Sequence, residues 1–141
     1  MNLMKHLLVV TLVLAAIGQF SIAMINLTLV RIMHWQDDVS RIPLLIRQVF
    51  HVHAWFISLT LVIFAALTCR FAVEMTAGTE QIYRWIACSI GLFWTFRVAL
   101  QLWYYKSSHW RGIRSRTTVH IILLIVYSGF SIVYLTAGLR G

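Results

Sequence analysis

The chain has 141 residues, of which 60% are hydrophobic and 11% are charged, and its formal net charge is +8 at pH 7. A mean hydropathy of +0.81 excludes an ordinary soluble domain and is typical of a protein built from membrane-spanning segments. The positive charge favours contact with anionic lipids. It does not favour nucleic-acid binding, because the sequence offers no exposed basic domain with base-reading elements.

Four apolar runs cover 7–30, 50–73, 82–105 and 119–139. Each is near the roughly 20 residues that a helix needs to cross the hydrocarbon core of a bilayer. The first run is far longer than the apolar core of a signal peptide, so we expect a retained helix. Short linkers predict antiparallel neighbours. The sequence thus predicts an all-α polytopic membrane protein, a single domain over 1–141 in which four transmembrane helices form an antiparallel bundle.

The first long linker, 31–49, carries a turn signal. Asp-Asp-Val-Ser at 37–40 precedes Pro43, which is the only proline of the chain. Proline is favoured in the first turn of a helix, and the apolar residues 44–46 follow it directly. We therefore predict a short interfacial helix in this linker, with its apolar residues below the headgroup layer.

Basic residues are divided unequally between the two sides that alternating helices define. The linkers 31–49 and 106–118 hold seven Lys or Arg residues, whereas the side with both termini and the turn around 74–81 holds four. By the positive-inside rule, both linkers lie in the cytoplasm and both termini lie outside.

Cys69 and Cys88 flank the turn on the outer side. We expect buried free thiols, although a disulfide bridge stays open as an alternative.

Polar and aromatic residues form stripes at helical spacing, because residues three, four or seven apart share a helix face. The third segment carries Trp94, Arg97, Gln101 and Tyr104. The fourth carries His120, Tyr127, Ser131 and Tyr134. Together with His51, Trp55 and Ser58 of the second segment, these stripes predict a polar cleft that opens toward the cytoplasmic side.

Arg97 lies deep in the third apolar run, where an arginine stays charged and costs several kcal/mol unless it is paired or solvated. All four acids of the chain fall between the apolar runs. Arg97 is therefore either a structural clamp, bonded to backbone carbonyls, Gln101, Tyr127 or an inward Asp37 or Asp38, or the anchor of a ligand. The planar guanidinium suits a carboxylate, a phosphate or a quinone-type oxygen. The predicted ligand-binding residues are Arg97, Gln101, Tyr104, His51, His120 and Tyr127.

Two other functions stay open. His51 or His53 with His120 could ligate a b-type haem axially, or help to hold a divalent metal. The chain could also be a purely structural scaffold for other membrane subunits. The sequence has no nucleotide-binding, nucleophile-elbow or metalloprotease motif. We therefore expect a non-catalytic subunit or accessory of a membrane complex, in contact with membrane lipids, that binds a quinone, a lipid head group or a similar anionic or carbonyl ligand.

Overall fold

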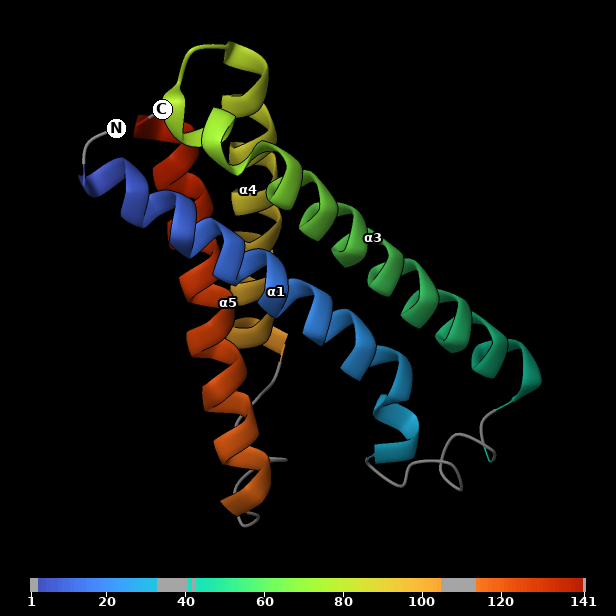
Figure 1. The fold of residues 1–141 in the computed structure, drawn as a ribbon. Coiled ribbons are helices and arrows are strands. Elements are labelled where there is room, and N and C mark those ends of the chain that lie inside the picture. The colour runs from blue at the N-terminus through green and yellow to red at the C-terminus, as the bar shows by residue number, and fades with distance from the viewer. Residues whose placement is uncertain (1–2, 33–40, 42, 105–113, 141) are drawn as a thin grey trace. The chain divides into compact units, whose positions relative to one another are not determined.

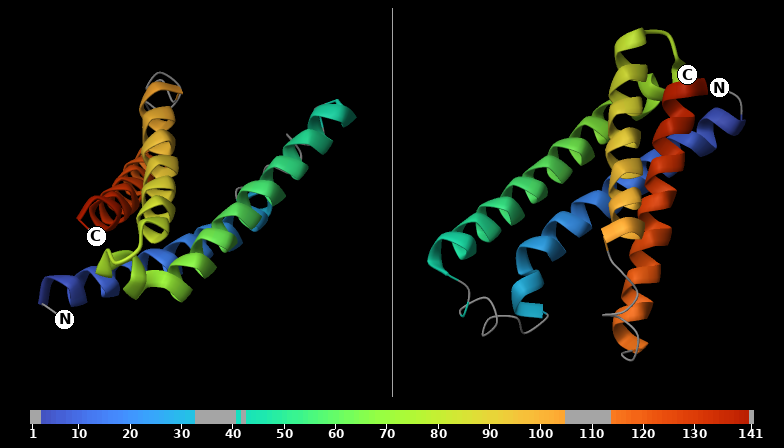
Figure 2. Two further views of the ribbon diagram at one scale, coloured as in Figure 1. Left: turned by 90° about the horizontal axis from the view of Figure 1, so that it is seen from above. Right: turned by 180° about the vertical axis from the view of Figure 1, so that it is seen from behind.

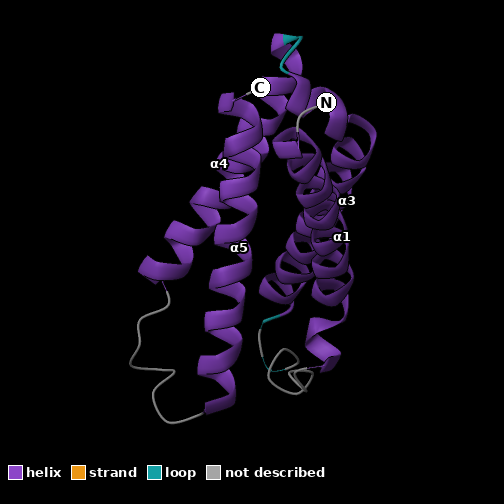
Figure 3. Cartoon of the chain, turned by 60° about the vertical axis from the view of Figure 1, so that its left-hand side comes forward, coloured by secondary structure: helices purple, strands orange, loops and turns teal. Residues whose placement is uncertain are grey.

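The computed structural model describes residues 3–32, 41, 43–104 and 114–140, and all the regular structure in them is helical. The helices are α1 (Leu3–Ile32), α3 (Leu44–Ala77), α4 (Gln81–Tyr104) and α5 (Arg114–Arg140) (Figure 1). Figure 3 shows how little of the described chain is loop. Each helix contains a stretch long and apolar enough to cross a membrane. The prediction of four such helices is confirmed.

Three of the four helices, α1, α3 and α5, extend at both ends beyond the apolar runs that predicted them, whereas α4 matches its run to within one residue at each end. Hydropathy marks only the residues that hydrocarbon would accept, whereas a helix continues through polar flanks whose lysines and arginines are good helix formers. The difference matters most at α3. The Pro43 carbonyl accepts a hydrogen bond of 3.1 Å from the Arg47 amide, and residues 44–46 form the first turn of α3. The predicted separate helix at Pro43 is therefore wrong for these residues, while 33–40 and 42 lie outside the described residues.

The end of α3 and the start of α4 are joined by a tight turn. Gly78 has a φ of 70°, the left-handed conformation that commonly ends a helix and that glycine adopts without strain. About two turns earlier, Phe71 leaves the helical conformation with φ −120° and ψ 16°, so α3 is kinked there. The Phe71 ring packs on Tyr83 of α4, with 5.2 Å between the centroids.

The chain forms two compact units, and each is described by itself. One comprises 13–70, with the larger parts of α1 and α3. In this unit Asn26 Nδ2 donates to the Ala54 carbonyl at 3.0 Å and to Ser58 Oγ at 2.9 Å. Asn26 therefore links α1 to α3 by two interhelical hydrogen bonds. Polar contacts of this kind hold helices together where lipid removes the hydrophobic drive between them.

The other unit comprises 1–12 and 71–141. Here α4 and α5 lie side by side along their lengths, as both views in Figure 2 show. Arg84 of α4 donates from Nε to the Gly138 carbonyl of α5 at 3.1 Å, and the pairing continues to Gln101 and His120. As residue numbers increase along α4, from 84 to 101, the numbers of the α5 residues that they contact decrease, from 138 to 120.

Small residues bring α4 and α5 together. A Cβ added at Gly91 would lie 2.9 Å from two side-chain carbons of Leu135, and one at Gly138 would lie 2.9 Å from the Cys88 backbone nitrogen.

Both Cys69 and Cys88 are free thiols, as predicted. The prediction that both are buried is wrong, because Cys69 is exposed and Cys88 is only half-buried.

Candidate functional site

The polar and aromatic stripes predicted in the third and fourth segments face one another. Trp94, Arg97 and Gln101 follow one face of α4, and His120, Tyr127 and Phe130 meet them from α5; these six residues are called the α4–α5 seam. At its centre the Trp94 ring lies 5.0 Å from Tyr127 and 4.8 Å from Phe130, centroid to centroid. All three rings are buried. Tilted contacts at this distance stabilise the pair beyond the area they bury.

Arg97 lies over the Tyr127 ring. Its Cζ is 5.2 Å from the ring centroid, within the range of a cation–π interaction. The side chain is half-buried. Among the residues that the structure describes, Arg97 has no hydrogen-bond or ion-pair partner. The predicted clamp by hydrogen bonds to Gln101 or Tyr127 is therefore not what the structure shows, and the guanidinium is instead positioned by stacking.

The second polar contact of the seam joins Gln101 to His120. Gln101 Nε2 lies 2.9 Å from His120 Nδ1. If the amide nitrogen donates, His120 carries its own proton on Nε2, an assignment that depends on the orientation of the amide. Gln101 is buried and His120 is half-buried. The contact holds the His120 imidazole of α5 against the face of α4 that carries Arg97 and Gln101.

Two buried polar atoms of the seam lack a hydrogen-bond partner among the described residues, the indole Nε1 of Trp94 and the Oε1 of Gln101. Leaving such a group unsatisfied costs roughly 1–3 kcal/mol. Buried polar groups without a protein partner are unusual enough that each needs a specific explanation. Here a donor, an acceptor and a cation, none hydrogen-bonded to the described residues through these groups, follow one face of α4 over the eight residues 94–101.

Ser131 also reaches this interface, and Tyr134 lies three residues after it on α5. Ser131 Oγ and Thr95 Oγ1 lie 2.6 Å apart, and Tyr134 is fully buried. Sequence reasoning selected Ser131 and Tyr134 but missed Thr95 and Phe130. Phe130 was detectable, because it lies three residues after Tyr127 and so shares its face. Thr95 gave no such signal, since it lies off the stripe of Trp94, Arg97 and Gln101.

The predicted residues on the second segment have a different setting. His51 and His53 are exposed on α3, in the unit that holds 13–70. The stripe of His51, Trp55 and Ser58 differs in burial along its length. Trp55 is exposed, whereas Ser58 is buried and hydrogen-bonded to Asn26. The convergence of this stripe with those of the third and fourth segments stays a prediction. The Tyr104 side chain, Asp37 and Asp38 lie outside the described residues.

The described residues contain no group of three or more His, Cys, Asp or Glu side chains placed to hold a metal ion. The haem and metal alternatives built on His51, His53 and His120 stay predictions. What the seam itself offers is a cation backed by an aromatic ring, a buried amide and an imidazole. This set is suited to holding an acceptor oxygen. Comparisons of the chain with protein-family models, with curated proteins and with solved structures found no match.

Proposed function

We propose that the protein is a multi-pass membrane protein in which the four helices cross the bilayer as an antiparallel bundle. Large apolar side chains are exposed along every helix, among them Leu14, Phe56, Leu92 and Ile125, which suits a surface that faces lipid. In this arrangement both termini lie outside. The linkers 31–49 and 106–118, with most of the basic residues, lie in the cytoplasm.

We propose further that Arg97 anchors a ligand in the α4–α5 seam. The observation that carries this proposal is the Arg97 guanidinium stacked on Tyr127 with no hydrogen-bond partner among the described residues. Five N–H donors then remain available for a carbonyl, carboxylate or phosphate oxygen. The ligand is a quinone, a lipid head group or a compound of similar anionic or carbonyl chemistry.

The magnitudes favour an anchor over a purely structural stack. A charge near the centre of a membrane helix costs about 2.5–3.5 kcal/mol on insertion scales. A desolvated cation–π contact returns about 2 kcal/mol or more, but it leaves the guanidinium N–H groups without acceptors. Arg97 lies seven residues before the end of α4, which is about 10 Å along the axis, so snorkelling toward the interface is only partial. A ligand oxygen supplies the missing acceptor.

The neighbouring residues have distinct roles in this proposal. Tyr127 fixes the guanidinium by its ring face, and Trp94 fixes Tyr127. Gln101 and His120 form a second polar pair one turn along the seam from Arg97. A role of Tyr104 and His51 in ligand binding stays a prediction. The protein acts as a subunit or accessory of a larger membrane complex to which it presents the bound ligand.

The test is to identify what the protein carries. The full chain is extracted in mild detergent or native lipid particles, and native mass spectrometry records the small molecules bound to wild type, Arg97→Gln and Arg97→Lys. We expect a stoichiometric quinone or anionic lipid on wild type, reduced at least about tenfold in Arg97→Gln, because one charge-assisted contact is lost. Arg97→Lys should fall between them, since an ammonium binds as a point charge and not as a fork. Equal occupancy in all three proteins would overturn the proposal.

The same preparation separates the alternatives. A Soret absorption band that disappears in His120→Ala and survives in Arg97→Gln would replace the anchor by a haem. Stoichiometric partner subunits with no bound small molecule in wild type would replace it by a scaffold.

A further inference from the structure

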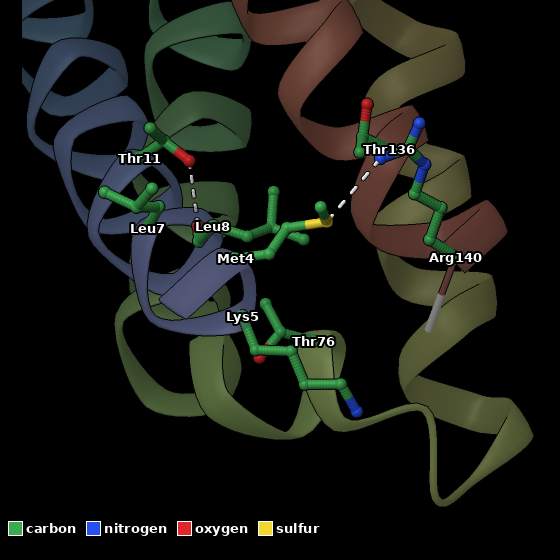
Figure 4. A pocket seen from close by; sticks show the side chains of 8 residues that line it. All are labelled: Met4, Lys5, Leu7, Leu8, Thr11, Thr76, Thr136 and Arg140. Carbon is green, nitrogen blue, oxygen red and sulfur yellow. Dashed lines mark hydrogen bonds between the residues drawn. The ribbon is translucent and has the colours of Figure 1, made fainter. Parts of the chain in front are cut away.

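The unit that holds 1–12 and 71–141 contains a pocket that shares no residue with the α4–α5 seam. Its volume is about 290 Å³, close to the lower limit for small-molecule sites. Its walls come from the first turns of α1, the end of α3 and the end of α5 (Figure 4). The lining residues are Met4, Lys5, Leu7, Leu8, Thr11, Thr76, Thr136 and Arg140.

The pocket combines an apolar interior with two cations and no acid. Leu7, Leu8 and Met4 supply the apolar wall, and the lining includes Lys5 and Arg140 but neither Asp nor Glu. From Lys5 to Thr11 the α1 axis advances about 9 Å. A ligand that fits this shape has a negative head and an apolar tail of several carbons.

The two cations are held by weak or neutral acceptors. Lys5 Nζ donates to the Ala77 carbonyl at 3.3 Å, at the end of α3. Arg140 Nη1 lies 3.9 Å from Met4 Sδ, and a thioether sulfur is a weak acceptor. Both side chains are exposed, so each keeps donors for an additional partner.

We propose that this pocket binds the anionic head group and the first part of one acyl chain of a membrane phospholipid. The head lies between Lys5 and Arg140, and the chain runs along Leu8 toward Thr11. The proposal rests on the proposed membrane location, because that location puts both cations at the outer interface where lipid head groups lie. It does not rest on the Arg97 site. A phosphate head satisfies both cations and an acyl chain fills the apolar wall, which free phosphate cannot do.

The test uses the full chain in a neutral detergent, titrated with phosphatidylglycerol or phosphatidylcholine, with native mass spectrometry as the readout of one bound lipid. We expect tighter binding of phosphatidylglycerol. Lys5→Gln with Arg140→Gln should weaken it roughly tenfold to thirtyfold, in line with the contribution of two basic residues near an anionic head group. The matched control is Arg41→Gln with Arg47→Gln, which removes the same charge from exposed and half-buried positions outside the pocket. Equal weakening by both double variants would overturn the proposal.

Two further arms separate the sources of the effect. Leu8→Trp fills the apolar wall and keeps both cations, so it should weaken phosphatidylglycerol binding. Inorganic phosphate in large excess should leave the bound lipid in place. Unchanged lipid binding in Leu8→Trp, or displacement by phosphate, would reduce the pocket to a simple anion site and contradict the proposal. The loss caused by Lys5→Gln with Arg140→Gln should be the same in the wild-type and the Arg97→Gln backgrounds, also when the ligand at Arg97 is itself an anionic lipid. A failure of the pocket is therefore distinguishable from a failure of the Arg97 site.

Discussion

The contact between α1 and α3 and the seam between α4 and α5 place polar side chains between apolar helices in different ways. The Asn26 amide nitrogen donates to two acceptors at 2.9 and 3.0 Å, one of which is a backbone carbonyl. In the seam, Arg97 is stacked without a hydrogen bond to the described residues, and Trp94 Nε1 and Gln101 Oε1 are buried without one. The first arrangement is what helix packing alone requires. A buried amide oxygen without a hydrogen bond to the described residues also occurs in the first region, at Gln19 Oε1. The seam therefore differs chiefly in its stacked cation, and that is why we place the ligand there.

The largest effect should come from Trp94, which is 2% exposed and contacts both Tyr127 and Phe130. Trp94→Ala should lower the free energy of unfolding by about 3–5 kcal/mol, because it opens a cavity at the centre of the seam. Trp94→Phe is the control that keeps a ring and removes only the N–H. Unfolding in mixed detergent micelles measures both variants. A loss in Trp94→Ala no larger than that in Trp94→Phe would show that the seam is not a packed core.

Glycine substitutions should rank by the space that the structure leaves for a Cβ. Gly138→Ala and Gly91→Ala force contacts of 2.9–3.0 Å, several of them with backbone, and should destabilise by about 1–3 kcal/mol. Gly129→Ala has nothing within 4 Å and should be neutral or stabilise by up to about 1 kcal/mol, since alanine is the better helix former. Thermal unfolding of the three variants gives the ranking. A reversed order would mean that α4 and α5 do not approach at Gly91 and Gly138.

Asn26 provides the corresponding test in the other unit. Asn26→Ala removes both interhelical hydrogen bonds and should cost about 0.6–2 kcal/mol, the range found for such bonds in membranes. Ser58→Ala should cost less, because Asn26 keeps its bond to the Ala54 carbonyl. Unfolding in detergent micelles again measures the difference. Equal losses would indicate that the Ala54 bond contributes nothing.

The smallest change in stability is expected at Arg97. Arg97→Gln loses a cation–π contact of about 0.5–2 kcal/mol but also relieves the burial of a charge, which costs a similar amount or more. The unliganded protein should therefore unfold within about 1 kcal/mol of wild type, or be slightly more stable. A loss above about 3 kcal/mol would instead assign Arg97 a structural role like that of Trp94.

Much of the α4–α5 seam was predictable from spacing. Trp94, Arg97 and Gln101 define one face of a helix, and His120 and Tyr127 define another, so their meeting needs only that the two helices pack. The stacking of Arg97 on Tyr127 was not predictable, because spacing does not distinguish a ring face from a hydroxyl as the partner. The difference in burial between Ser58 and Trp55 was also not predictable, because a stripe of three residues does not show which of them a neighbouring helix covers. The ends of α1, α3 and α5 were underestimated because hydropathy does not register polar helical turns.

The central claim, that Arg97 anchors a ligand, is tested most directly by ligand-induced stabilisation. Small molecules extracted from the wild-type preparation are returned to delipidated wild type and Arg97→Gln in identical nanodiscs, and the unfolding midpoint is measured with increasing concentration. A ligand that binds only the folded state raises the midpoint in proportion to its occupancy. We predict a concentration-dependent rise for wild type, and for Arg97→Gln a rise that needs at least about ten times more extract. The same rise at the same concentration in both proteins would contradict the claim.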